Sequence, residues 1–390
     1  MTNTSQSRTI AMVMAAIITA ALVTCQVACT RSNEGKTPEE IFNTEASGVA
    51  IVLNNVFYKA SMPNGISFYF SGIENGELKD LTTNIDSIKL STVSGTAFFV
   101  DDQGSLLTNR HVVYPELPRD QVVACVNKST ARLMMFYQHR STELAQMMAE
   151  TQQEIENNVY WDFDFWGRNF THESPANDSL RVQLQALSTE RERVEQALET
   201  LSYVNPSQIQ VQVSTNLSIA LHNQRVTTAN DFMQCKTVMM SPEDNVDLAL
   251  IRLKSEQTPE ECHVFRTPQE TDEWDSPTLA EREKLAITQP LVMIGYNQGL
   301  MLGATEQGIQ AQLTTGTISQ EPDNQRVMYS IAALQGSSGS PVLNQWGELV
   351  AVNYAGILNS QSFNFGIPLV QINKYLKDWG VIKPTRKKMG

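Results

Sequence analysis

The chain has 390 residues, of which 41% are hydrophobic, and a formal net charge of −13 at pH 7. This length can bury a substantial core and accommodates two β-domains with an insertion. The negative charge argues against nucleic acid or an anionic membrane surface as the main partner, because like charges repel. Only the tail at 383–388 is basic, and we expect it to be solvated.

Residues 1–29 have the pattern of an export signal. Arg8 precedes an apolar run at 10–23, which has the length of a signal-peptide core and is short for a membrane span. A cysteine soon after such a run suggests a lipoprotein, and Cys29 and Cys25 are the candidates for lipidation. We therefore expect export to the cell envelope (periplasm or outer membrane), anchoring by an N-terminal lipid, and a polar tether at 30–44. A secreted soluble protein and an uncleaved anchor are the alternatives.

Short apolar runs bounded by turns predict a first β-barrel over 45–127 and 208–254. The expected strands include 48–54, 66–71, 95–100, 106–108, 121–126 and 231–240. Cys125 and Cys235 would then lie on neighbouring strands. A disulfide formed in an oxidising compartment and a pair of free buried thiols both remain open.

The first barrel is interrupted by residues 128–207, in which apolar residues recur at helical spacing. The pattern predicts two helices that form an antiparallel hairpin. The segment that joins them is aromatic and contains Tyr160, Trp161, Phe163, Phe165, Trp166 and Phe170. We expect these rings to pack on the rest of the protein. The alternative is an exposed patch that binds substrate, a partner or a membrane interface.

Residues 255–289 form a polar linker, with a short helix expected at 279–287. A second β-barrel and a C-terminal helix follow over 290–380; the first strand is expected at 290–295 and the helix at 369–379. The sequence has no Cys/His cluster with the spacing of metal ligands and no phosphate-binding loop. No cofactor is therefore expected.

Three short segments carry the residues of a Ser-His-Asp hydrolase. His111 follows an expected strand, Asp247 opens the apolar run 248–253, and Ser338 lies between glycines in the loop 336–339. A serine hydroxyl needs a base to take its proton, and imidazole, with an ordinary pKa of about 6.5, can accept that proton and return it. A carboxylate then holds the ring in the required tautomer. We interpret the three residues as nucleophile, base and orienting acid.

The loop 336–339 is also expected to form an oxyanion hole. Glycine allows backbone conformations with positive φ and lets a substrate carbonyl approach closely. We assign the backbone N–H groups of Gly336 and Ser338 to this site. Ser337 and Ser340 are expected to have no catalytic role.

Together these segments resemble the trypsin-fold serine proteases, in particular the bacterial HtrA (Deg-type) branch, in which His, Asp and Ser occur in this order. The similar stretches are 94–113, 244–251, 336–343, 347–353 and 363–368, and the resemblance covers 45–130 and 208–380. It implies a mostly β fold of two six-stranded antiparallel β-barrels, here with an inserted helical hairpin, and serine endopeptidase activity. Ser337 and Ser340 replace the Asn or Asp and the Gly that are usual in the family. We expect no PDZ domain, and therefore no regulation through such a module.

The resemblance also places Ala332, six residues before the nucleophile, at the floor of the S1 pocket. Alanine cannot attract Lys or Arg, so we expect cleavage after small or medium apolar residues. The expected partner is a polypeptide substrate. The alternative function is that of a catalytically silent trypsin-fold binding protein which acts through its helical hairpin. The sequence leaves the oligomeric state open.

Overall fold

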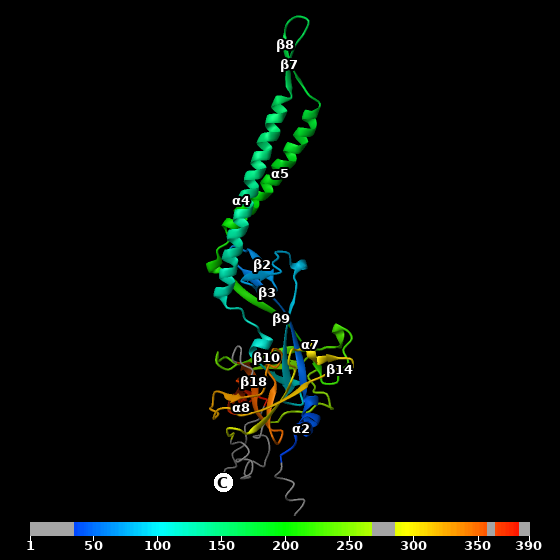
Figure 1. Ribbon diagram of the computed structural model, residues 1–390, viewed down its shortest axis with the longest axis vertical. Coiled ribbons are helices and arrows are strands. Elements are labelled where there is room, and N and C mark those ends of the chain that lie inside the picture. Colours follow the sequence, from blue (N-terminus) through cyan, green and yellow to red (C-terminus); the bar gives the residue numbers. More distant parts are fainter. Residues whose placement is uncertain (1–34, 267–284, 357–362, 382–390) are drawn as a thin grey trace, which may run out of the picture. The chain divides into compact units, whose positions relative to one another are not determined.

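The computed structural model describes residues 35–266, 285–356 and 363–381, which form two compact units (Figure 1). The first unit contains the described residues up to Asn54, Val93–Val113, and those from Leu217 onward. The second contains Asn55–Thr92 and Tyr114–Asn216. The predicted export signal, with Cys25 and Cys29, lies outside the described residues, as do most of the predicted linker helix and the basic tail.

A closed six-stranded antiparallel barrel forms the first half of unit one. The strands follow one another around the barrel in the order β1 (Val49–Ser61), β5 (Ser91–Phe99), β6 (Ser105–Thr108), β11 (Ala249–Leu253), β10 (Met233–Met240) and β9 (Gln210–Leu221). Pairing of β9 with β1 closes the barrel. Central strands such as β6 and β11 have apolar residues on both faces and are almost fully buried, because one face fills the barrel and the other packs outside it.

The second half of unit one is a curled sheet of six antiparallel strands. Their order is β15 (Gln312–Thr317), β12 (Pro290–Gly295), β17 (Pro341–Asn344), β18 (Leu349–Gly356), β19 (Asn364–Pro368) and β16 (Val327–Tyr329). The two ends of the sheet meet at an isolated bridge between Ile318 and Tyr329. The predicted fold of two six-stranded barrels is therefore confirmed, with the second present as a half-barrel.

Short helices complete unit one. Helix α8 (Leu369–Asp378) agrees with the predicted C-terminal helix and buries Ile372 and Leu376 in the core. Helix α2 (Pro38–Glu45) lies where a tether was predicted. Thr37 caps its first turn, accepting from the N–H of Glu40 at 3.2 Å while the Glu40 carboxylate accepts from the N–H of Thr37. The remaining elements are α3 (Arg110–Val113), α7 (Leu300–Gly303), β13 (Ala304–Thr305) and β14 (Gly308–Ile309).

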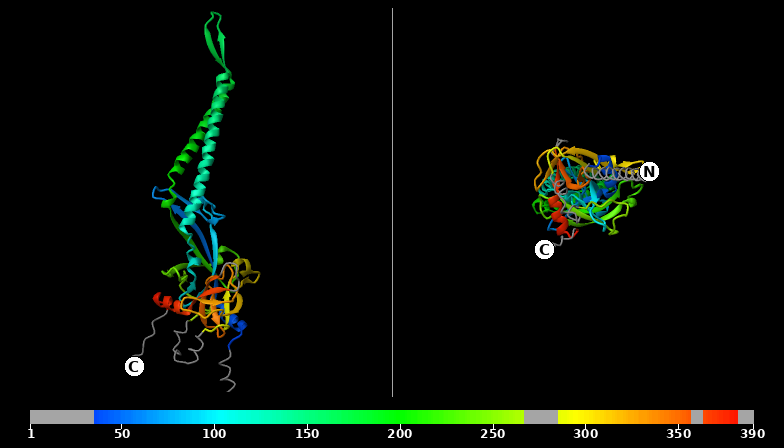
Figure 2. Two further views of the ribbon diagram at one scale, coloured as in Figure 1. Left: turned by 60° about the vertical axis from the view of Figure 1, so that its left-hand side comes forward. Right: turned by 90° about the horizontal axis from the view of Figure 1, so that it is seen from below.

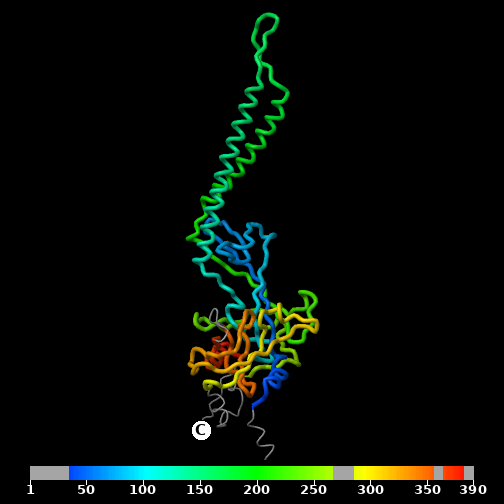
Figure 3. The backbone as a smooth tube through the Cα atoms, in the orientation of Figure 1, coloured from blue at the N-terminus to red at the C-terminus, as the bar shows by residue number. Residues whose placement is uncertain are grey.

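The second unit contains the predicted helical hairpin, with α4 (Arg119–Asn157) and α5 (Ala176–Ser202) packed side by side (Figures 2 and 3). Leu144, Leu187 and Val194 form the buried cluster between them. The unit also holds β2 (Ser67–Phe70), paired with the end of β1, and a small hairpin of β3 (Gly72–Glu74) and β4 (Glu77–Lys79).

The strand predicted at 121–126 is wrong, because α4 already begins at Arg119. Val122, Cys125 and Val126 are buried, and their spacing of three and four residues is that of one helix face rather than of a strand. Cys125 therefore lies on a helix of unit two and Cys235 on a strand of unit one. Both cysteines and Cys262 are free thiols, and burial raises the pKa of Cys235 to about 12.

The aromatic segment forms a β-hairpin of β7 (Val159–Phe163) and β8 (Asn169–Glu173) at the end of the helical pair. Its six rings do not pack on the protein as expected: exposure ranges from 45% at Phe170 to 95% at Phe165. Among the described helices, none combines the length and apolar character needed to span a bilayer.

Candidate active site

His111 lies in α3, directly after strand β6. The backbone there is fixed by two hydrogen bonds to the carbonyl of Asp247, one from the Asn109 side chain at 2.8 Å and one from the Arg110 N–H at 3.4 Å. Asp247 precedes β11, which pairs with β6 along Ala249↔Thr108 to Arg252↔Ser105. The β6–β11 ladder therefore sets the distance between the histidine and the aspartate.

Both carboxylate oxygens of Asp247 accept hydrogen bonds from His111. Oδ2 lies 2.5 Å from the ring Nδ1, and Oδ1 accepts from the backbone N–H at 3.0 Å. The neighbours Val246 and Leu248 are buried, while the Asp247 side chain is 21% exposed and that of His111 46%. A carboxylate at Nδ1 favours the tautomer with the proton on that nitrogen, which leaves Nε2 as the acceptor.

Ser338 lies in the loop between β16 and β17, and it is the only partly exposed serine of the loop segment 336–340. Ser337 is 2% exposed, and its hydroxyl donates to the Leu334 carbonyl at 2.7 Å. Ser340 is fully buried. Burial therefore favours Ser338 over its two neighbours as a residue that can meet a substrate.

Thr96 of β5 connects the serine loop to the histidine segment. Its N–H donates to the Ser338 carbonyl at 2.8 Å, and its hydroxyl donates to the Gly336 carbonyl at 2.9 Å. Its own carbonyl accepts from the hydroxyl of Thr108, three residues before His111, at 2.7 Å. The structure thus joins His111 and Asp247 directly and ties the Ser338 loop to the same barrel end. Thr96 was not singled out from the sequence, although it lies in the stretch 94–113 on which the resemblance rests.

The two amides assigned to the oxyanion hole are both directed away from their loop. The Gln335 carbonyl accepts from the Gln298 N–H at 2.6 Å, and the Ser337 carbonyl accepts from the Asn353 side chain at 2.9 Å. In a trans peptide the N–H points opposite to the carbonyl. The N–H groups of Gly336 and Ser338 therefore point away from Gln298 and Asn353, respectively. Within the described part of the chain, neither N–H group has a hydrogen-bond acceptor.

Glycine is required at two positions of this loop. Gly336 has φ +94° and Gly339 has φ +89°, a region that other residues rarely adopt. A Cβ at Gly336 would lie 2.4 Å from the Tyr296 carbonyl oxygen, and one at Gly339 would lie 2.0 Å from the Thr96 carbonyl oxygen. Both the backbone conformation and the space exclude side chains here.

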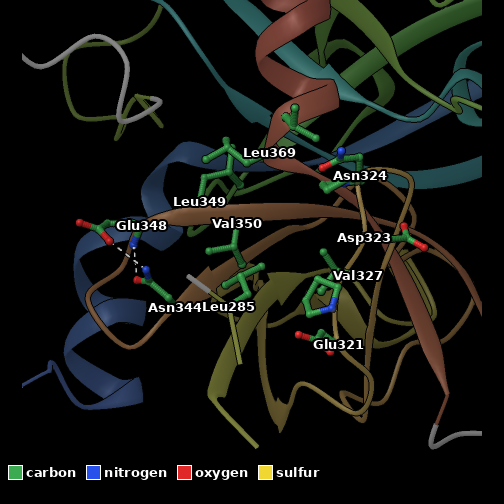
Figure 4. A pocket seen from close by; sticks show the side chains of 13 residues that line it. Leu285, Glu321, Asp323, Asn324, Val327, Asn344, Glu348, Leu349, Val350 and Leu369 are labelled. Atoms are coloured by element: carbon green, nitrogen blue, oxygen red, sulfur yellow. Dashed lines mark hydrogen bonds between the residues drawn. The ribbon is translucent and has the colours of Figure 1, made fainter. Parts of the chain in front are cut away.

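Ala332, the predicted specificity residue, is exposed and follows the buried Ile331. A separate cavity of about 350 Å³ lies in the same unit, against β18 and the start of α8 (Figure 4). It has apolar walls, including Leu349, and an acidic rim that includes Glu321 and Glu348. None of the predicted site residues lines it, so this cavity is distinct from the His111–Asp247 site.

Comparison with known proteins gives one family match and one similar solved structure. Residues 202–352 match the family model of the trypsin-like peptidase domain. Among solved structures, the chain is similar to the serine endoprotease from Yersinia pestis, with 12% sequence identity and a TM-score of 0.41; the match covers 88% of this chain and 66% of that one. No curated protein matches the chain. Residues 202–352, which include Asp247 and Ser338, are therefore similar in sequence to trypsin-like peptidase domains.

Proposed function

We propose that the protein is a serine endopeptidase in which Ser338 is the nucleophile, His111 the general base and Asp247 the orienting acid. The observation that carries this proposal is the pair of hydrogen bonds from His111 to the two oxygens of Asp247, at 2.5 and 3.0 Å. The bond at Nδ1 orients the imidazole, and the bond from the backbone N–H holds the carboxylate beside it, as a base acting on a serine hydroxyl requires.

The reaction follows from these groups. Nε2 of His111 takes the Ser338 proton as the oxygen attacks the scissile carbonyl, and the N–H groups of Gly336 and Ser338 receive the developing oxyanion. The imidazolium, stabilised by Asp247, then protonates the leaving amine, which leaves an acyl-enzyme on Ser338. Water activated by the same histidine releases the second product.

Labelling with a fluorophosphonate probe tests this assignment. In the soluble form, residues 31–390, we expect one label on Ser338. Ser338→Ala should abolish labelling and lower kcat by at least about 10⁴-fold, as in other triads. Ser340→Ala is the matched control, because this buried neighbour should leave labelling intact. A folded wild type that does not label, or that labels elsewhere, would contradict the proposal.

We further propose that cleavage follows small or medium apolar residues, because no charge at Ala332 can attract a basic side chain. Chromogenic peptides that end in Val or Ala should be hydrolysed at least about tenfold faster than those ending in Arg or Lys, since apolar pockets discriminate by about 1–3 kcal/mol. Equal or faster hydrolysis after Arg would refute this preference.

A second candidate function is capture of apolar segments of unfolded polypeptides by the β7–β8 hairpin. The exposure of all six rings favours it. In the ladder Tyr160 pairs with His172 and Trp161 with Thr171, so aromatic side chains occur on both faces of the hairpin. Phe165 and Trp166 follow in the turn, which Asp164 holds by accepting from the N–H groups of Trp166 and Arg168. Rigid exposed rings are effective contact groups.

The double variant Trp161→Ala/Trp166→Ala separates capture from chemistry. We expect the KM for an unfolded protein substrate to rise severalfold, while the kcat/KM for a short peptide and the thermal stability stay unchanged. Phe136→Ala, which removes an exposed ring from the middle of α4, is the control. If the KM for the protein substrate did not change, the hairpin would have no role in capture.

Export to the cell envelope and lipidation at Cys29 or Cys25 also remain our proposal, based on the apolar run at 10–23. Mass spectrometry of the mature N-terminal peptide should show a lipid-modified cysteine as its first residue. An unmodified mature terminus would favour the secreted alternative.

A further inference from the structure

Two buried residues outside the triad lead directly to the serine loop. Tyr329 of β16 is fully buried, and its hydroxyl donates to Oδ1 of Asn353 at 2.8 Å. Asn353 of β18 is 2% exposed and lies where the β18–β19 ladder shifts register, between Asn353 and Ala355. Such a bulge redirects a side chain out of the regular sheet pattern. Here it directs the Asn353 amide toward the loop.

Asn353 holds the residues on both sides of Ser338. Its Nδ2 donates to the Ser337 carbonyl at 2.9 Å and lies 3.2 Å from the Ser337 hydroxyl. Its backbone carbonyl accepts from the Gly339 N–H at 2.8 Å, and its N–H donates to the Ser340 carbonyl at 2.9 Å. Asn353 thus contacts the loop immediately before and after the nucleophile, and the Ser340 N–H is a second donor to the Ser337 carbonyl, at 3.0 Å.

The direction of this chain of hydrogen bonds follows from the chemistry of its groups. The Ser337 carbonyl can only accept, so the Asn353 NH₂ group must face it and the Asn353 oxygen must face Tyr329. Burial raises the pKa of Tyr329 well above its usual range, so its hydroxyl stays protonated and donates. Without that donor, the buried Asn353 oxygen would lose its partner, and the amide could rotate to find another.

The space for the tyrosine comes from Gly366 on the neighbouring strand β19. A Cβ at Gly366 would lie 3.1 Å from Cε1 of Tyr329 and 3.2 Å from its hydroxyl oxygen, and 2.7 Å from Cβ of Ala351. Glycine therefore leaves room for the ring beneath the loop.

We propose that Tyr329 and Asn353 are positioning residues, which hold the Ser337–Ser338 peptide so that the Ser338 N–H faces the oxyanion. This inference rests on the proposed serine endopeptidase function and extends it to groups that touch neither substrate nor triad. Because the Ser337 carbonyl is held by Asn353, the Ser338 N–H on the same peptide unit is turned outward.

The test is Tyr329→Phe in the full-length protein, which removes one oxygen and keeps the ring. Loss of a complete oxyanion donor costs about 10²–10³ in kcat, so a loosened donor should lower kcat about tenfold with little change in KM. The affinity for a valine-terminated peptide boronic acid, whose adduct is tetrahedral, should weaken by the same factor. The affinity for the corresponding product peptide should not change.

Tyr58→Phe is the matched control. Tyr58 is buried, and its hydroxyl donates to the backbone carbonyl of Pro115 at 2.9 Å, whereas that of Tyr329 donates to a side-chain oxygen. Tyr58 lies in the other unit. Tyr58→Phe should lower the free energy of unfolding by about as much as Tyr329→Phe does, and it should leave kcat unchanged. A second variant, Asn353→Leu, has a similar size and no group that can donate to the Ser337 carbonyl, and it should lower kcat further. If Tyr329→Phe behaved like Tyr58→Phe, the proposal would be overturned.

A readout that does not need turnover separates this inference from the proposed function. In a crystal structure of Tyr329→Phe, the Ser337 carbonyl should have left the Asn353 Nδ2, which it contacts at 2.9 Å in the wild type. Retention of that contact would refute the positioning role even if the wild type proved inactive. An inactive wild type together with a displaced carbonyl would contradict only the peptidase proposal.

Discussion

Gly339 is a position of the serine loop at which only glycine fits. Its φ of +89° is matched closely by Gly65, at +87°, in a turn of the second unit. The two positions differ in their surroundings: a Cβ at Gly339 would lie 2.0 Å from the Thr96 carbonyl oxygen and 2.5 Å from the Thr108 hydroxyl, whereas a Cβ at Gly65 would meet nothing within 4 Å. Comparing substitutions at Gly65 and Gly339 therefore separates the cost of backbone strain from the cost of a steric clash.

We expect Gly65→Ala to cost about 1–2 kcal/mol, the strain of a positive φ alone. Gly339→Ala should cost clearly more, because backbone atoms must move, and should lower fluorophosphonate labelling by at least about 10²-fold through the displaced oxyanion donors. Urea unfolding measures the stability of each variant, and the rate of fluorophosphonate labelling measures the effect on the serine loop. Equal stability of the two variants would show that the loop relaxes without cost.

At the scale of elements, the α4–α5 pair is held by a small core. Leu144 is fully buried between the helices, with Leu187 and Val194 against it. Arg140 adds an ion pair to Glu190, with Nη2 at 2.6 Å, but both side chains are more than a third exposed, so this pair contributes little. Most of the stability of the pair therefore comes from apolar burial.

Leu144→Ala should destabilise the helical pair by about 2–5 kcal/mol, the range for truncating a buried leucine. Met135→Ala, at an exposed position of the same helix, should change stability by less than about 0.5 kcal/mol. Hydrogen exchange of α4 and α5 measures the effect. The kcat for a short peptide should stay constant in both variants, because every proposed catalytic residue lies in unit one; a parallel loss of kcat would contradict this separation.

At the scale of the whole molecule, unit one is assembled from segments that are far apart in the chain. The Asp247–His111 bond joins residues 136 positions apart, and the Thr96–Gly336 bond joins residues 240 apart. The helices of unit two are formed by hydrogen bonds between residues close in sequence, and the β7–β8 hairpin joins the two neighbours. Non-local contacts form slowly because loop closure costs entropy before any contact is gained.

We therefore expect refolding in two phases. The helical circular-dichroism signal should recover first, and competence for fluorophosphonate labelling should recover more slowly, by at least about tenfold, given the range of rates between local and non-local topologies. Stopped-flow circular dichroism measures the recovery of the helices, and quenched fluorophosphonate labelling measures the recovery of the serine site. Recovery of both signals at one rate would indicate that the units fold together.

The sequence by itself determined much of the architecture and supplied the candidate catalytic residues. His111, Asp247 and Ser338 were found from local motifs, because a strand end, an apolar run and a glycine-flanked serine each leave a short-range pattern. The helical hairpin followed from its apolar spacing in the same way. The strand predicted at 121–126 is wrong, because a short apolar run fits a strand or a helix face, and here its buried residues lie on one face of α4.

Only the tertiary structure decided which serine is accessible, how the aromatic segment is exposed and what supports the loop. Ser337 and Ser340 differ from Ser338 through burial, which depends on contacts with distant strands. The roles of Thr96, Tyr329 and Asn353 arise from hydrogen bonds across 240, 24 and 16 residues, respectively. No local sequence pattern predicts such bonds, because each of these residues on its own is an ordinary strand residue. Its role comes from a distant partner that only the fold brings into contact with it.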